Sequence, residues 1–201
     1  MLFINSKYKG DDIIFKVAIM QPYLFPYIGY FQLINYVDTF VIYDDVDYIK
    51  REWINRNRIL IEGEPYLFTL SLKKASQNKH INQISIYETK KGKNKLLKTI
   101  KHAYSKAPYY NNIIPLIKRI ILNDENNLAK FIEFSIKEIT HYLQLNTEFV
   151  MSSNLKKNNE LKGQKKIVNI CNKLNVEEYV NLIGGKDIYD KEIFEENSIQ
   201  L

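Results

Sequence analysis

The chain has 201 residues, a formal net charge of +6 and one cysteine. A single cysteine excludes an internal disulfide and a thiolate zinc cluster, and this length suits one domain with its own hydrophobic core. The mild basicity does not require nucleic acid, and it fits acidic partners such as phosphorylated small molecules or an acidic carrier protein.

Residues 1–15, MLFINSKYKGDDIIF, do not have the pattern of a signal peptide, because Asp11 and Asp12 interrupt a few scattered apolar residues. No apolar run along the chain approaches the roughly 20 residues that a membrane-spanning helix needs. We therefore expect a cytoplasmic protein without membrane insertion.

A strand, a helix and a second strand are expected at the start of the domain. The run 15–20, FKVAIM, is short, apolar and rich in β-branched residues, as buried strands are. Pro22 and Pro26 keep the following residues extended or turned. Apolar residues then recur at helical spacing over 27–37, and 39–46 is a strand that ends in carboxylates. Such a unit favours parallel pairing of its two strands.

The rest of the chain continues the alternation of strands and helices. Further strands are expected at 65–72, 81–86, 147–153 and 177–183. Further helices are expected at 93–105, 109–122, 126–143 and 162–175, and Pro115 should kink or divide the second of them. We predict an α/β fold, with a mostly parallel Rossmann-like sheet in a single domain, 16–201, and a helical insertion at about 93–143.

Polar residues follow the ends of the expected strands. Ligands of parallel sheets bind beyond the carboxyl ends of the strands, so these residues are expected to converge. They are Gln21 after the first strand, Asp44 and Asp45 at the end of the second, Lys73, Lys74, Ser76, Gln77 and Asn78 after the third, and Gly184, Gly185 and Lys186 after the last.

Three blocks of the chain resemble the WbqC-like family. They are MQPYLFPYIGYFQLINYVDTFVIYDDVDYIKREWINRNRIL (20–60), FTLSLKKASQNKHIN (68–82) and YVNLIGGKDIYDKEIF (179–194). The likeness spans roughly 16–201. Family members usually begin close to the first strand and continue beyond the point that matches Leu201. We therefore expect 1–15 to be an extension, and a further strand and helix of the family to be missing here.

The resemblance implies a role in making bacterial surface polysaccharides such as O-antigen, because family members occur in gene clusters for them. Some of these clusters make amino sugars that carry glycine or other acyl groups on nitrogen, and they also encode an amino-acid-activating enzyme and a small carrier protein. The resemblance thus implies an aminoacyl or acyl transferase. Its acceptor is the amino group of a nucleotide-linked amino sugar, an acidic acyl or peptidyl carrier is its partner, and no cofactor or metal is expected.

Two alternatives remain open at this point. An ATP-dependent ligase or nucleotidylyl transferase would use ATP, and its adenylate-forming relatives carry two histidines around a glycine where the first helix begins. Here Tyr27 and Tyr30 flank Gly29 instead, so the histidine pair is absent and the sequence supports this alternative less well. A non-catalytic protein that binds a sugar nucleotide is the second alternative.

Two carboxylates of the stretch 43–60, YDDVDYIKREWINRNRIL, are candidate bases. A carboxylate beside an amine can accept the proton that an attacking amino sugar loses. Adjacent strand residues point to opposite faces, so only one of Asp44 and Asp45 would meet the ligand. The alternative is that the pair caps the next turn or binds an arginine.

The arginines of the same stretch are candidate phosphate ligands, because guanidinium groups match phosphate oxygens. The candidates are Arg51, Arg56 and Arg58; if 50–60 is helical, Arg51 and Arg58 share one face. Alternatively, they pair with nearby aspartates on the surface and contribute little to stability. Trp53 can stack on a base or sugar, or pack half-buried. Tyr23, Tyr27 and Asn55 of the same matching block complete the expected substrate contacts.

The segment 72–80, LKKASQNKH, is expected as a loop that binds phosphate or sugar hydroxyls, although a solvated hairpin would look similar. His80 titrates near neutrality and is a candidate proton shuttle. The other histidines, His102 and His141, fall in expected helices, and three scattered histidines do not indicate a zinc site. The glycines of GGKDIYDKE (184–192) let the backbone approach a ligand, or form a plain turn, and their spacing is not that of a P-loop.

Cys171 is the remaining candidate nucleophile, since a thiolate can form a thioester intermediate. It lies on the amphipathic helix expected at 162–175, close to Ile167, Ile170 and Leu174. That pattern is typical of a small buried apolar residue, so we predict a structural role.

Overall fold

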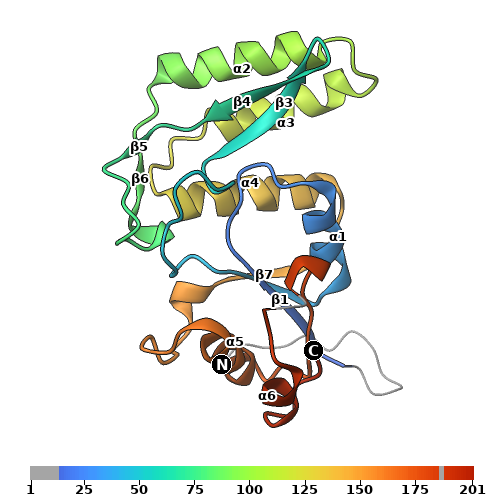
Figure 1. The fold of residues 1–201 in the computed structure, drawn as a ribbon. Coiled ribbons are helices and arrows are strands. Elements are labelled where there is room, and N and C mark those ends of the chain that lie inside the picture. Colours follow the sequence, from blue (N-terminus) through green and yellow to red (C-terminus); the bar gives the residue numbers. More distant parts are fainter. Residues whose placement is uncertain (1–13, 186–187) are drawn as a thin grey trace.

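The computed structural model describes residues 14–185 and 188–201, and it has an α/β fold built on a four-stranded parallel sheet (Figure 1). In spatial order the strands are β7 (Glu148–Met151), β2 (Thr39–Ile42), β1 (Lys16–Met20) and β8 (Glu178–Tyr179). Helix α1 (Ile28–Tyr36) joins β1 to β2, and these two strands pair in parallel. The predicted Rossmann-like class and the predicted strand–helix–strand unit are both confirmed.

Helices cover both faces of this sheet, as the burial of a parallel sheet requires. Helices α1 and α4 (Leu128–Tyr142) pack on one face, and α5 (Gly163–Leu174) and α6 (Lys191–Glu195) pack on the other. Because successive side chains of a strand point to opposite faces, Ala18 of β1 joins the first layer while Val17 and Ile19 join the second.

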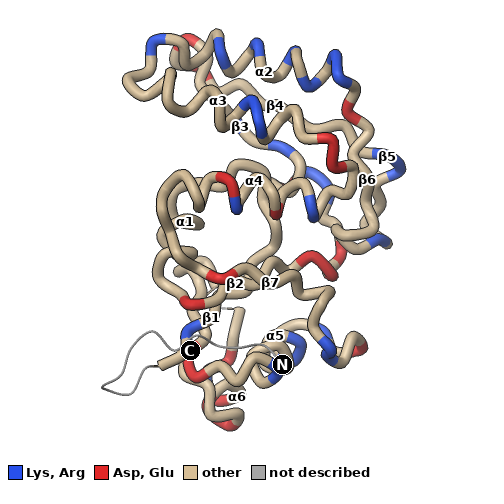
Figure 2. The backbone as a smooth tube through the Cα atoms, turned by 180° about the vertical axis from the view of Figure 1, so that it is seen from behind, with Lys and Arg blue, Asp and Glu red and all other residues tan. Residues whose placement is uncertain are grey.

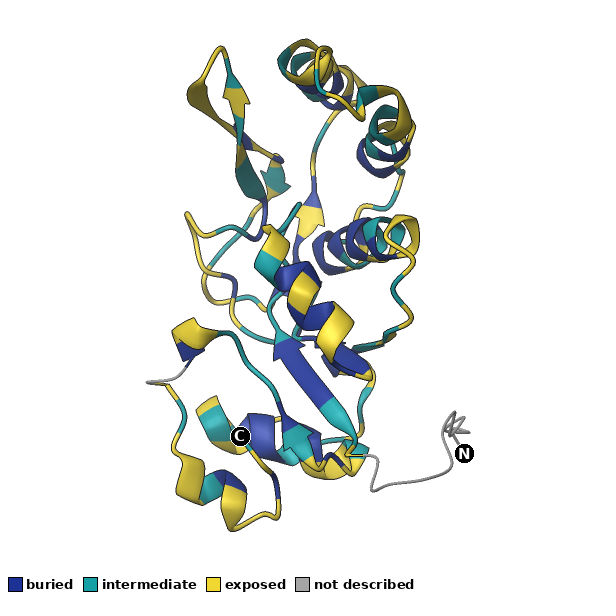
Figure 3. Ribbon diagram, turned by 90° about the vertical axis from the view of Figure 1, so that its right-hand side faces the viewer, coloured by how far each residue is buried: buried dark blue, intermediate teal, exposed yellow. Residues whose placement is uncertain are grey.

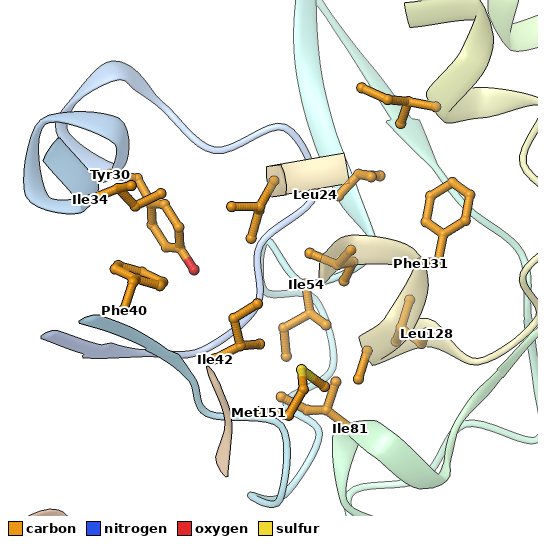
Figure 4. Close-up of a cluster of buried hydrophobic side chains, with 14 of the residues drawn as sticks. Leu24, Tyr30, Ile34, Phe40, Ile42, Ile54, Ile81, Leu128, Phe131 and Met151 are labelled. Carbon is orange, nitrogen blue, oxygen red and sulfur yellow. The ribbon is translucent and has the colours of Figure 1, made fainter. Parts of the chain in front are cut away.

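The core between the sheet and α1 is aromatic. The rings of Tyr30 and Phe40 lie 5.1 Å apart at their centroids, and Figure 4 shows Ile34 and Ile42 beside them. Tyr30 is fully buried, and its hydroxyl donates to the carbonyl of Gln21 at 3.0 Å, which satisfies the buried polar group. The same hydrogen bond fixes the chain where it leaves β1.

The expected strand at 65–72 exists, but its place in the parallel sheet was predicted wrongly. Strand β3 (Arg56–Ile61) and strand β4 (Glu64–Thr69) form a separate antiparallel hairpin. Glu62 and Gly63 connect them, both with positive φ (52° and 85°), as in the two-residue turns that suit hairpins. A connection this short cannot join parallel strands, which need a long crossover.

Two other expected strands are shorter than predicted. The segment 81–86 consists of a 3₁₀ turn, η1 (Ile81–Gln83), and the two-residue β6 (Ser85–Ile86), which pairs with β5 (Leu72–Lys73). The segment 177–183 contributes only β8 to the sheet and then continues to η3 (Ile183–Gly185). Consequently the polar residues 73–78 do not follow a strand of the main sheet.

The helices of the expected insertion divide between two places. Helix α4 belongs to the core, whereas α2 (Lys90–Tyr104) and α3 (Tyr110–Ile121) pack beside the hairpin, with their buried faces turned inward (Figure 3). Pro115 lies inside α3 without dividing it. Within the two described ranges, no helix is both long enough and apolar enough to span a bilayer.

Candidate functional site

A cavity of about 780 Å³ lies between the hairpin, the segment after β1, and helices α2 and α3. Buried Phe68 and Ile100 form part of its wall, and Tyr27 and Tyr109, which are 60% and 72% exposed, stand at its rim. This is the size of pocket that holds a small organic ligand. Among the residues that the structure describes, no carboxylate and no histidine line it.

The hairpin holds the segment after β1 in place at this cavity. Asn57 Nδ2 donates to the carbonyls of Leu24 at 2.9 Å and Phe25 at 2.6 Å. Phe25 has a φ of 48°, a left-handed conformation that costs a non-glycine residue energy unless its surroundings fix it. These hydrogen bonds supply that restraint and present Tyr23 and Tyr27 to the cavity.

Arg58 is the charged residue of the cavity wall, and it stands beside Trp53. The guanidinium carbon of Arg58 lies 5.3 Å from the centre of the Trp53 ring, and that of Arg56 lies 5.8 Å from it. Both distances allow cation–π attraction. The segment is a strand and not a helix, so Arg56 and Arg58 share a face, while Arg51 lies in a turn with a φ of 66°.

The alternative considered above, in which these arginines pair with nearby aspartates, does not hold for Arg56 and Arg58. In the described parts of the chain, no carboxylate lies within ion-pairing distance of Arg56 or Arg58. Arg56 Nε is buried and also finds no hydrogen-bond acceptor there. Two unneutralised guanidinium groups beside an aromatic ring form a suitable place for an anion.

Asp44 ties the ends of two strands together. It is buried and lies two residues beyond β2, not inside the strand as predicted. Its carboxylate accepts hydrogen bonds from the Ser153 backbone N–H at 2.9 Å, the Ser153 hydroxyl at 2.6 Å and Asn82 Nδ2 at 3.0 Å. Both oxygens are thus engaged next to the end of β7, which favours a structural role over that of a base.

Asp45 is held by two buried ammonium groups. Lys157 Nζ lies 2.7 Å and Lys166 Nζ 3.2 Å from Asp45 Oδ2, and Lys166 also donates to the Asp45 carbonyl at 2.8 Å. Burial acts to raise the pKa of the Asp45 carboxyl, but Lys157, the Ser152 side chain and Lys166 together outweigh it and keep that pKa below its ordinary value. Neither Asp45 nor Asp44 lines the cavity.

The loop 73–80 runs beside the aspartates and not beside the cavity. Backbone N–H groups of Asn82 and Ile81 donate to the carbonyls of Asp44 and Val46, and His80 Nε2 lies 3.7 Å from Asp47 Oδ1. Ser76 Oγ accepts from the Asn78 N–H at 3.2 Å. His80 is therefore a neighbour of the aspartates. The cavity is not lined by the other expected residues of this loop, which are Lys73, Lys74, Ser76, Gln77 and Asn78.

The remaining expected contacts also lie away from the cavity. Asn55 is buried, accepts from the Tyr48 hydroxyl at 2.8 Å and donates to the Leu70 carbonyl at 2.8 Å, so it is a structural residue. Gly184 is exposed, while Gly185 is buried with its Cα facing the Asn181 side chain. Lys186 lies outside the described residues.

The other candidate nucleophiles and ligands do not form a centre. Cys171 is fully buried, and burial raises the pKa of its thiol to about 12. His102 and His141 are exposed on α2 and α4. Where the chain is described, three or more metal-ligating His, Cys, Asp or Glu side chains do not gather in one place.

The structure therefore joins four of the expected residues, Tyr23, Tyr27, Trp53 and Arg58, on one cavity. It adds aromatic residues that the sequence interpretation missed: Tyr104, Tyr109 and Tyr110. Their signal in the sequence is the segment YSKAPYY at 104–110, where tyrosines gather around a proline between two helices. Exposed aromatic residues of this density are typical of binding surfaces.

Comparison with known proteins places the chain in a family. The model of the WbqC-like protein family matches residues 21–201, so the chain belongs to that family. The uncharacterized protein Rv1507c of Mycobacterium tuberculosis (strain ATCC 25618 / H37Rv) is 31% identical over 190 residues, which cover 92% of this chain and 80% of that relative. No solved structure matches the chain significantly.

Proposed function

We propose that this member of the WbqC-like family transfers an acyl or aminoacyl group to the amine of a nucleotide-linked amino sugar in surface-polysaccharide (O-antigen) biosynthesis. The reaction class comes from the family resemblance. The structural support is one arrangement: Arg56 and Arg58 lie beside the Trp53 ring without carboxylate partners in the described residues, and Trp53 and Arg58 line an aromatic cavity. A base can stack on the indole, and a diphosphate can take both guanidinium groups.

The proposed reaction needs no cofactor if the donor is a thioester. The amine nitrogen attacks the thioester carbonyl, an amide C–N bond forms, the C–S bond breaks, and one amine proton ends on the released thiol. No described lining residue is a carboxylate or histidine that could take a proton from an ammonium group. In this proposal the amine therefore enters the site already in its neutral form. Burial raises the pKa of Tyr23, so its hydroxyl stays protonated and can donate to the developing oxyanion.

A carrier protein is the proposed source of the thioester, and α2 offers a surface for it. The helix has no acidic residue, and Figure 2 shows lysine positions distributed along it. Its exposed lysines are Lys90, Lys91, Lys95, Lys98 and Lys101. Ile100 and Tyr104 on the inner side of the same helix line the cavity. An acidic carrier on this face would stand next to the site of transfer.

The test is a transfer assay with three parallel reactions. The purified protein is incubated with a nucleotide-linked amino sugar and an acyl-carrier thioester, with the amino sugar, glycine and ATP, or with the amino sugar alone. Mass spectrometry detects the amide product. Product in the first reaction only supports the proposal, ATP-dependent product supports the ligase, and binding of the amino sugar without any product supports the non-catalytic alternative.

A further inference from the structure

We infer that the donated acyl group is large and apolar, and that the cavity beneath α2 and α3 binds its chain. This inference rests on the proposed function for the identity of the reaction, but the chain-binding site rests on the cavity itself. Glycyl or acetyl groups are too small to need such a cavity, which has a volume of about 780 Å³.

The composition of the wall carries the inference. Helix α3 contributes Ile113, Ile114 and Ile117, α2 contributes Ile100, and the hairpin contributes Ile59 and Phe68. These side chains offer no hydrogen bonds, so polar ribose or sugar hydroxyls placed among them would lose their water without replacement. An alkyl chain has no such cost and gains from each methylene that leaves water.

The other lining side chains include five tyrosines, which are amphipathic, and two more polar residues, Asn57 and Arg58. Asn57 is already engaged with two backbone carbonyls, which leaves Arg58, beside Trp53, as the charged group of the described lining. The isoleucine part of the cavity therefore suits an apolar chain, while the Arg58 end stays with the diphosphate of the sugar nucleotide. A thioester with a long acyl chain matches the isoleucine part of the wall, and the sugar nucleotide matches the part at Arg58 and Trp53.

The experiment measures binding of acyl-coenzyme A thioesters of two, four, eight and twelve carbons, by displacement of the dye 8-anilinonaphthalene-1-sulfonate. We expect affinity to rise by up to about 4-fold per added methylene, the scale of hydrocarbon burial. The variant Ile114→Trp fills part of the cavity and should end this rise at a shorter chain. Ile113→Phe serves as a milder second variant if Ile114→Trp fails to fold, which circular dichroism would show.

The matched control is Ile183→Trp, because Ile183 is 86% exposed and does not line the cavity. It should bind the whole thioester series as the unmodified protein does. Equal affinity for acetyl and dodecanoyl thioesters, or a chain-length dependence that neither cavity variant changes, would overturn the inference.

The outcome is separable from that of the proposed function. Suppose that affinity rises with chain length, that the cavity variants end this rise at a shorter chain, and that no transfer to an amino sugar is found. This result would support the chain-binding site and contradict the proposed transferase function. Efficient transfer of glycyl or acetyl groups together with flat chain-length dependence would keep the transferase and remove the chain site.

Discussion

The Lys157 ammonium lies 2.7 Å from Asp45 Oδ2, and the Lys157 side chain is completely buried. Lys157 also donates to the Ser152 carbonyl, directly after β7, while Asp45 follows β2. The pair therefore links the ends of two neighbouring strands of the parallel sheet. Such links are built from charges that water no longer solvates, so the loss of one partner leaves the others poorly compensated.

Replacement of this lysine should destabilise the fold. Lys157→Met removes one of the two cations at Asp45, and Lys166 remains at 3.2 Å, so we expect a loss of about 2–4 kcal/mol, at or below the usual cost of breaking a buried ion pair. Urea unfolding measures it. The control is Lys156→Met, at an exposed neighbouring lysine, which should change stability by less than about 0.5 kcal/mol. Equal stability of both variants would show that the buried pair contributes nothing.

Stability should also fall at acid pH through the same carboxylate. The pKa of Asp45 is lower in the folded chain than the value of about 3.9 expected when it is unfolded. Its contribution is thus fully present above about pH 4 and is lost as the pH falls through the folded-state pKa. Urea unfolding between pH 2.5 and 7 should show a shallower acid decline for Asp45→Asn than for the unmodified protein, although the variant is less stable at neutral pH. Parallel curves would contradict this.

A substitution at Asp44 distinguishes a structural role for this residue from a role as the catalytic base. Asp44→Asn replaces one acceptor oxygen with an N–H₂ group that faces the donors of Ser153 or Asn82, so we expect a loss of about 1.5–3 kcal/mol in the free energy of unfolding. Turnover per folded molecule should change little. A variant of unchanged stability whose turnover falls by about 10²-fold would restore the base.

The sequence was sufficient for the elements that depend on local pattern. The strand–helix–strand unit from β1 to β2 follows from apolar runs and two prolines, and its parallel pairing follows from the crossover rule. The hairpin was missed although Gly63 follows RNRILIE and precedes EPYLFT, with a turn residue between two β-patterned runs. That signal would have placed Arg56 and Arg58 on one face of a strand.

The rest of the site could not be predicted because it depends on tertiary contacts. Nothing local distinguishes Asp44, which meets Ser153 more than a hundred residues away, from an exposed carboxylate. Likewise, Lys157 lies in a segment rich in lysine and asparagine and Lys166 lies near the start of α5, yet both side chains are buried against Asp45. The cavity needs α2 and α3 to be placed next to the hairpin, and no periodicity specifies that packing.

Cys171 should prove dispensable for chemistry. Its thiol is fully buried, and burial raises its pKa to about 12, so almost no thiolate exists at neutral pH. Cys171→Ala should lose about 1 kcal/mol of stability, as small core truncations do, and keep its transfer activity. Iodoacetamide should label the native protein far more slowly than the urea-unfolded protein. Rapid native labelling, or an inactive but folded variant, would reinstate the thiol as a nucleophile.

The arginines beside the indole should determine phosphate affinity. Arg58→Ala or Arg56→Ala should weaken binding of a nucleotide-linked sugar by about 1.5–3 kcal/mol, the range for hydrogen bonds to charged groups, with calorimetry as the measurement. Arg58→Lys keeps the charge but loses the planar fork, and it should recover only part of this loss. Arg51→Ala is the control, because Arg51 is exposed and does not line the cavity. If Arg56→Ala and Arg58→Ala bind the nucleotide-linked sugar as tightly as Arg51→Ala and the unmodified protein do, the guanidinium groups at Trp53 bind no phosphate and the proposed binding mode is wrong.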